Sequence, residues 1–175
     1  MAAVRGRGKG KLVRISRWYR VVIKSRTSRE EVLPSRAGRF HEEMNTEPTT
    51  YAADTVETAW REVAAHLGSI PANPAAFRLY RLSARNLQLV DLGKPRERKR
   101  YRITAEELLS DPPSPRCQAV AKELREAGYH GILYPSVRNL PEGQCVALFL
   151  EHVDAQLLLE PVEREWEQFI NQGRP

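Results

Sequence analysis

The stretch SRAGRFHEEMNTEPTTYAADTVETAWREVAAHL, residues 35–67, decides the fold of this chain. It predicts a turn at Gly38, a short strand that ends near Tyr51, and then a helix. Asp54 is a suitable N-cap for that helix, and Glu57 follows three residues later, as in a capping box. Apolar residues then recur at the spacing of one helix face: Val56, Ala59, Trp60, Val63, Ala64 and Leu67. We therefore expect this face to pack on a core.

Glu62 lies at the edge of that apolar face, close to Trp60. A carboxylate beside a buried aromatic residue costs free energy unless it has hydrogen-bond partners or a chemical task. The spacing alone leaves two interpretations open, a surface glutamate on an amphipathic helix or a functional carboxylate.

Composition favours a single soluble domain. The chain has 175 residues, a net charge of +6, and 41% hydrophobic and 29% charged residues, which suits one domain with its own core. No apolar run reaches the length of a membrane span and no signal peptide is visible, so we expect a cytoplasmic protein without membrane contact. Cys117, Cys145 and the scattered histidines show no metal-ligand spacing, so we predict no metal site.

Two basic runs, residues 5–20 and 96–102, carry much of the positive charge. Such runs can bind nucleic acid, an acidic protein or a phosphate-bearing ligand. Because no nucleic-acid-binding motif accompanies them, we interpret both as solvated surface and expect no direct contact with nucleic acid. Residues 1–11 are expected to form a flexible basic segment, and residues 12–175 a single domain.

The remaining elements point to an α+β fold. We predict strands over residues 12–24, 77–82, 87–92, 129–136, 144–151 and 155–159, and helices over 104–109, 115–127 and 162–170. Residues 27–34 and 93–102 are predicted as a linker and a polar loop, with a bend at residues 85–86. Ser114 is expected to cap the helix that begins at Pro115. Neither a regular βαβ rhythm nor a Gly-rich dinucleotide loop occurs, which argues against a doubly wound sheet.

Common enzyme signatures are absent: the sequence has no Walker loop, no HExxH and no GxSxG. The candidates for chemistry are polar residues on apolar elements: Arg20, Arg39, Tyr51, Glu62 and Ser136. Each also has a structural interpretation. Arg20 can cover the sheet with its aliphatic stem or aim a guanidinium at a phosphate or carboxylate. Tyr51 can fill the core, and Ser136 can end a strand.

In chain order, four fragments resemble the RES-domain family, named for an arginine, a glutamate and a serine. They are WYR at 18–20, AGRF at 37–40, TYAADTVETAWREV at 50–63 and CQAVAKELREAGYHGILYPSVRN at 117–139. Tyr51 and Glu62 stand eleven residues apart, as in the family. Ala37 replaces the second glycine of the family's Gly-Gly-Arg loop, and His41 stands where asparagine is frequent.

The resemblance implies an ADP-ribosyltransferase-like fold, with a mixed, split β-sheet core and flanking helices. It implies an enzyme that acts on NAD without a metal, with Glu62, Arg20 and Ser136 as catalytic residues. By the same resemblance, Arg20 and Arg39 would bind the diphosphate. Tyr51 would pack on the nicotinamide, and Ser136 would bind its amide or a ribose hydroxyl. Ser114, which precedes the CQAV fragment, is the alternative site serine.

The resemblance also implies a toxin of a bacterial type II toxin–antitoxin pair. Its partner would be a small DNA-binding antitoxin that blocks the site in a hetero-oligomeric complex. The acceptor stays open: water defines an NAD glycohydrolase, phosphate an NAD phosphorylase, and a protein side chain an ADP-ribosyltransferase. The departures at Ala37 and His41 keep a further alternative open, a non-enzymatic module that binds nucleic acid or protein.

Overall fold

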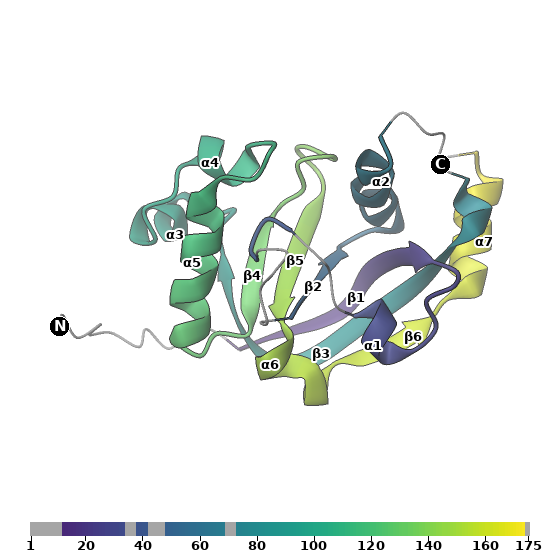
Figure 1. Cartoon of the computed structure of the whole chain (residues 1–175), viewed down its shortest axis with the longest axis horizontal. Coiled ribbons are helices and arrows are strands. Elements are labelled where there is room, and N and C mark those ends of the chain that lie inside the picture. The colour runs from purple at the N-terminus through teal and green to yellow at the C-terminus, as the bar shows by residue number, and fades with distance from the viewer. Residues whose placement is uncertain (1–11, 34–37, 42–47, 69–72, 174–175) are drawn as a thin grey trace.

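The computed structural model describes residues 12–33, 38–41, 48–68 and 73–173 (Figure 1). The predicted basic segment 1–11 and Ala37 lie outside these residues. Within the described residues, seven α-helices and two short 3-10 helices accompany six strands. No helix in this part of the chain combines the length and the apolar character needed to cross a membrane.

The strands form one mixed sheet that closes on itself. Its order is β1 (Leu12–Ile23), β2 (Thr49–Ala53), β5 (Gln144–Phe149), β4 (Gly131–Pro135), β3 (Phe77–Asp91) and β6 (Leu158–Pro161). Because β1 also pairs with β3, the first five strands make a ring, and β6 extends from β3. β3 and β4 are parallel, and the other pairs are antiparallel. This confirms the predicted α+β class.

The helices surround this sheet in groups. Figure 1 shows α3 (Pro95–Arg100), α4 (Ala105–Leu109) and α5 (Pro115–Glu126) at one end, and α2 (Val56–His66) and α7 (Glu163–Asn171) at the other. The short helices α1 (Arg29–Val32) and α6 (Leu150–Val153) lie at a third side. The two 3-10 helices are η1 (Pro74–Ala76) and η2 (Asp154–Gln156).

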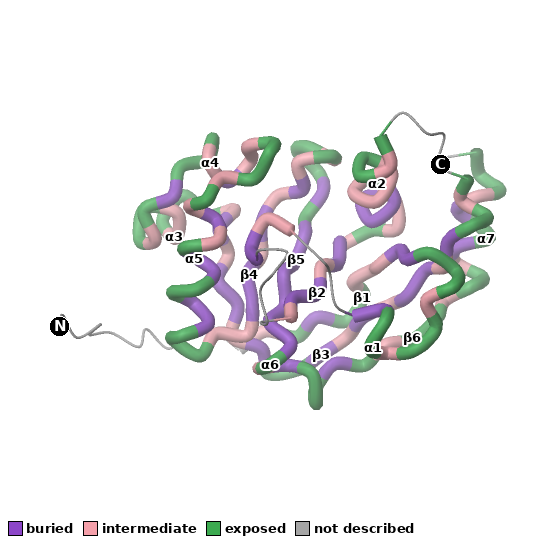
Figure 2. The backbone as a smooth tube through the Cα atoms, viewed as in Figure 1, coloured by how far each residue is buried: buried purple, intermediate pink, exposed green. Residues whose placement is uncertain are grey.

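The apolar face predicted for residues 56–67 packs on the core through Ala59 and Trp60, which are both buried. The Trp60 ring lies 5.4 Å from the ring of Phe77 on β3 and 5.6 Å from that of Trp166 on α7, measured between centroids. These contacts hold α2 against β3 and α7, so the helix face that carries Glu62 has a defined position. Figure 2 shows the buried residues running along the strands, with exposed residues on the outer helix faces.

The start of α2 differs from the prediction. Thr55, rather than Asp54, is the N-cap, because its hydroxyl accepts the backbone N–H of Thr58 at 3.0 Å. Asp54 instead continues the backbone pairing after β2, where its N–H donates to Gln144 O. β2 accordingly ends at Ala53, two residues beyond Tyr51.

Two predicted connections contain short helices. Residues 27–34 hold α1, which begins with a capping box between Ser28 and Glu31. Residues 93–102 hold α3, whose residues are good helix formers that follow Pro95 at the first turn. Such short helices depend on tertiary packing rather than on their own pattern, so periodicity misses them.

The predicted strands 77–82 and 87–92 are one continuous strand, β3. Asn86 adopts a left-handed φ of 57° inside it, and the pairing with β1 shifts register opposite it, between Val13 and Ile15. The expected bend is thus a local irregularity in β3, and the pairing between β1 and β3 continues on both sides of it. The last strand, β6, begins at Leu158 because η2 occupies the residues before it.

Candidate active site

A cavity of about 410 Å³ lies between α2 and the strands β1, β2 and β5. This volume is in the range of small-molecule sites. Four of the predicted site residues line the cavity: Arg20, Arg39, Tyr51 and Glu62. The fold therefore brings together side chains from β1, the Gly/Arg turn, β2 and α2, which lie far apart in the sequence.

Glu62 is half-buried on α2 and faces the end of β4. The Ser136 hydroxyl donates to Glu62 Oε1 at 2.5 Å, and the Cys145 thiol lies 3.7 Å from the same oxygen. Burial, followed by the charge of Glu62, raises the pKa of Cys145, so this group stays a neutral thiol. No hydrogen bond from a described residue reaches Oε2. Oε1 is thus fixed by hydrogen bonds, and Oε2 is available for a ligand.

Ser136 is fully buried at the end of β4. Its hydroxyl accepts the backbone N–H groups of Arg138 at 3.2 Å and Asn139 at 3.1 Å. These two bonds occupy the lone pairs of the oxygen and direct its proton to Glu62. Ser136 is therefore a fixed donor to the carboxylate.

Ser114 has a different role. It is the N-cap of α5, where its hydroxyl accepts the N–H of Arg116 at 3.2 Å. Its neighbour Pro113 lines the cavity, but neither Ser114 nor the fully buried Ser136 is among the lining residues. Of the two serines, Ser136 is the one that the fold joins to Glu62.

Arg20 points its guanidinium at backbone oxygens on two sides of the cavity wall. Nε donates to Val32 O at 2.7 Å and Nη1 to Tyr51 O at 2.8 Å. Burial, with the nearby charge of Arg26 as a smaller cause, lowers the pKa of Arg20 to about 10. The group therefore keeps its charge at neutral pH. It joins β1, α1 and β2 and does more than cover the sheet.

Arg39 ties the Gly/Arg turn to the end of α4. Its Nη1 donates to Leu108 O at 2.7 Å and to Ser110 O at 2.9 Å. The turn itself closes through a bridge between Gly38 and His41. A Cβ at Gly38 would lie 2.5 Å from the Tyr51 hydroxyl, so only glycine fits there. Gly38 of the AGRF fragment thus packs directly against the Tyr51 side chain.

Tyr51 holds this turn through its hydroxyl. The oxygen accepts the N–H of Phe40 at 3.0 Å and lies 2.9 Å from His41 Nδ1. The rings of Tyr51 and His41 stack with centroids 5.6 Å apart. Burial raises the pKa of Tyr51 above its ordinary value, so the phenol stays neutral. His41 itself is buried behind the tyrosine and helps to orient it.

Further polar side chains on the cavity wall were not predicted from the sequence: Arg26, His66, Asp111 and Arg138. Arg138, from the β4–β5 loop, pairs with Asp111 in the connection between α4 and α5. The sequence held one signal for it, because Arg138 stands two residues after Ser136 in the PSVRN fragment. Together with Arg20 and Arg39, these residues give the cavity an excess of positive charge, which suits an anionic ligand.

The described residues hold no group of three or more His, Cys, Asp or Glu side chains that could bind a metal ion.

Comparisons with known proteins agree with this geometry. The sequence profile described as "RES domain" matches residues 11–170. Among solved structures, a chain of the M. tuberculosis MbcT–MbcA toxin–antitoxin complex matches with a TM-score of 0.65 and 22% sequence identity. The match covers 90% of this chain and 90% of that chain, and it shows a common fold. No curated protein sequence matches the chain.

Proposed function

This chain belongs to the RES domain family, and on that premise we propose that it cleaves the nicotinamide–ribose bond of NAD. The observation that carries the proposal is the Glu62 carboxylate on the wall of a cationic cavity, which the buried Ser136 hydroxyl holds by a hydrogen bond. The carboxylate suits a reacting centre that becomes positive, and the arginines suit a ligand that carries a diphosphate.

The chemistry follows from the charges. When the bond between ribose C1′ and the nicotinamide nitrogen breaks, its electron pair goes to that nitrogen and neutralises the pyridinium ring. Positive charge develops on the ribose, as in glycoside cleavage. Glu62 stabilises this charge or holds a ribose hydroxyl through Oε2, while Ser136 fixes Oε1. An acceptor oxygen then forms the new bond to C1′.

Arginines on several cavity walls support binding of the diphosphate. Arg39 uses Nη1 for both of its backbone contacts, so its position is fixed while its charge stays on the wall. Arg20 is fixed by two carbonyls in the same way. Fixed cations bind an anion without losing further side-chain entropy. Tyr51 on β2 also lines the cavity, and we propose that it packs against the nicotinamide.

Water or phosphate would serve as the acceptor. Water yields nicotinamide, ADP-ribose and a proton, and phosphate yields nicotinamide and a phosphorylated ADP-ribose. The positive cavity supports phosphate as a second anionic ligand. The experiment is NAD consumption by the purified chain, with and without phosphate, with the products resolved by mass. We expect free nicotinamide in at least one buffer. A folded sample without turnover in either buffer would contradict the proposal.

A protein antitoxin is the partner that we propose. The structural relative is described as part of a toxin–antitoxin complex, and an NAD-degrading enzyme harms its own cell unless it is inhibited. We propose that the antitoxin covers the cavity and that it binds DNA. Expression of this chain alone should lower cellular NAD and stop growth, whereas Glu62→Gln should not. Equal growth with both versions would contradict the toxin role.

A further inference from the structure

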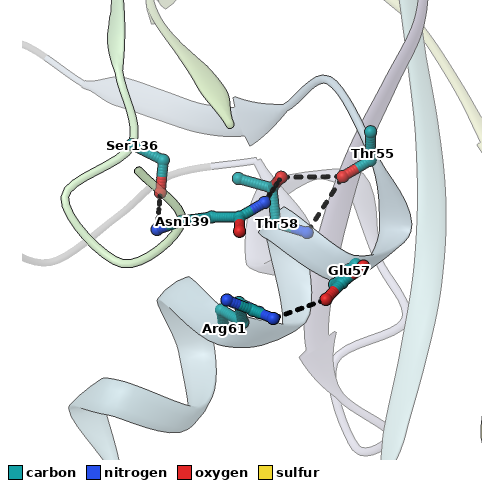
Figure 3. Close-up of polar contacts among 6 residues, drawn as sticks. All are labelled: Thr55, Glu57, Thr58, Arg61, Ser136 and Asn139. Atoms are coloured by element: carbon teal, nitrogen blue, oxygen red, sulfur yellow. Dashed lines mark hydrogen bonds and ion pairs between the residues drawn. The ribbon is translucent and has the colours of Figure 1, made fainter. Parts of the chain in front are cut away.

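The loop between β4 and β5 carries Ser136, and a buried side-chain contact ties this loop to α2. Asn139 Nδ2 donates a hydrogen bond to Thr58 Oγ1 at 2.9 Å (Figure 3). The Thr58 side chain is completely buried and Asn139 is half-buried. Neither residue lines the cavity, so neither is placed to touch a ligand.

Thr58 is itself held in place by the helix start. Its hydroxyl lies 2.7 Å from the hydroxyl of the N-cap residue Thr55, and its backbone N–H donates to the same Thr55 oxygen. Figure 3 shows Asn139, Thr58 and Thr55 in one chain of hydrogen bonds. Such chains fix the orientation of each member. The loop is thus attached to the rigid first turn of α2.

Helix geometry connects this contact to the proposed site. Thr58 and Glu62 are four residues apart on α2, so they lie on the same face in successive turns. Thr58 meets the loop at Asn139, and Glu62 meets it at Ser136. Asn139 also donates its backbone N–H to the Ser136 hydroxyl. One residue, Asn139, therefore contacts both points at which the loop and the helix meet.

Close packing confirms that the loop is pressed against the helix here. A Cβ added at Gly143 would lie 2.9 Å from Thr58 Cγ2 and 2.8 Å from the Asn139 Cβ. The Gly143 carbonyl also accepts the backbone N–H of Ser136 at 2.8 Å. The loop therefore has little room to shift unless the Asn139–Thr58 bond is lost.

We propose that Thr58 and Asn139 are positioning residues, whose hydrogen bond keeps the Ser136 hydroxyl aimed at Glu62. This inference rests on the proposed function. Without the bond, the loop gains freedom and the carboxylate loses part of its fixed donor. Arg20 and Arg39 are held by other elements, and Arg138 on this loop is also paired with Asp111, so substrate binding should change little. We therefore expect kcat to fall about tenfold while KM for NAD stays within about twofold.

The test compares matched variants of the full chain. Thr58→Val removes the hydroxyl at nearly constant volume and leaves the Thr55 cap intact, whereas Thr58→Ser keeps the hydroxyl. Asn139→Ala breaks the same bond from the loop side and serves if Thr58→Val does not fold. Arg61→Ala is the control, because Arg61 lies on the same helix and its side chain only pairs with the partly exposed Glu57 at 2.6 Å (Figure 3).

We expect lower kcat for Thr58→Val and Asn139→Ala, and near-normal kcat for Thr58→Ser and Arg61→Ala. The double variant Thr58→Val/Asn139→Ala should be no slower than either single one, because both remove one interaction. Normal kcat in the folded Thr58→Val and Asn139→Ala variants would overturn the inference. So would a Thr58→Ser variant as slow as Thr58→Val, or effects that add in the double variant.

A second readout separates this inference from the proposed function. Cys145 lies beside Glu62 on the cavity wall and is only 3% exposed, so a bulky thiol reagent should modify it slowly in the native protein. Loosening the loop in Asn139→Ala should accelerate this modification severalfold, as followed by mass at Cys145. An unchanged rate would overturn the inference even if NAD is consumed. A faster rate in a chain that does not consume NAD would overturn the proposed function alone.

Discussion

Ser136→Ala, compared with Ser114→Ala, tests which serine serves the site. Ser136→Ala removes a hydrogen bond to a charged acceptor and leaves the backbone N–H groups of Arg138 and Asn139 without their acceptor. Together these losses should cost roughly 3 kcal/mol of unfolding free energy. Ser114→Ala removes an N-cap, which costs about 1 kcal/mol. Both costs are below the usual stability of a domain of this size, so both variants should fold.

The assay has two parts because stability alone does not separate the serines. Denaturant unfolding, followed by tryptophan fluorescence, should give the larger loss for Ser136→Ala. Turnover at saturating NAD should fall at least about tenfold for Ser136→Ala, because Glu62 loses its fixed donor, and should be unchanged for Ser114→Ala. Normal turnover in a folded Ser136→Ala variant, with loss in Ser114→Ala, would refute the assignment.

Three further predictions follow from the same contacts. Glu62→Gln should lower turnover at least about a hundredfold with little change in stability, because it keeps the shape of the side chain and removes its charge. Glu57→Gln, at a partly exposed position of the same helix, should match wild type in the same assay. Arg26→Ala should raise KM for NAD severalfold and leave kcat nearly unchanged, because Arg26 lies on the cavity wall without an ion pair to a described residue. An unchanged KM would show that Arg26 does not contribute to NAD binding. Gly38→Ala should lower the unfolding midpoint and turnover together, since its Cβ would collide with the Tyr51 hydroxyl, and a stable, active variant would contradict that geometry.

Local patterns predicted the parts of the site that depend on one element. Helical spacing identified the buried face of α2 and placed Glu62 at its edge, and the structure has Trp60 in the core and Glu62 half-buried. The strand that ends at Ser136 was also visible as a short apolar run. Spacing did not decide whether Glu62 has a function, because that depends on Ser136, which lies 74 positions away.

Contacts between distant segments account for what the sequence could not predict. Arg39 donates to the carbonyls of residues 108 and 110, and Arg20 donates to carbonyls on α1 and β2. Backbone carbonyls occur at every residue and leave no mark in a sequence. The hydrogen bond between Asn139 and Thr58 could not be predicted either, because a sequence does not distinguish a buried threonine from any other helix residue. Such polar contacts follow from packing, which only the fold defines.

The partners of Glu62 are consistent with the charge that the proposed reaction needs. Its described donors, Ser136 and Cys145, are both neutral, and no described lysine, arginine or histidine forms an ion pair with it. A cation at the same place would orient the carboxylate equally well, but it would also cancel the field that opposes the positive ribose. The neutral donors at Oε1 orient the Glu62 carboxylate without neutralising its charge, and they leave Oε2 open to the ribose. The arginines that line the cavity come from other elements: Arg20 from β1, Arg39 from the Gly/Arg turn and Arg138 from the β4–β5 loop.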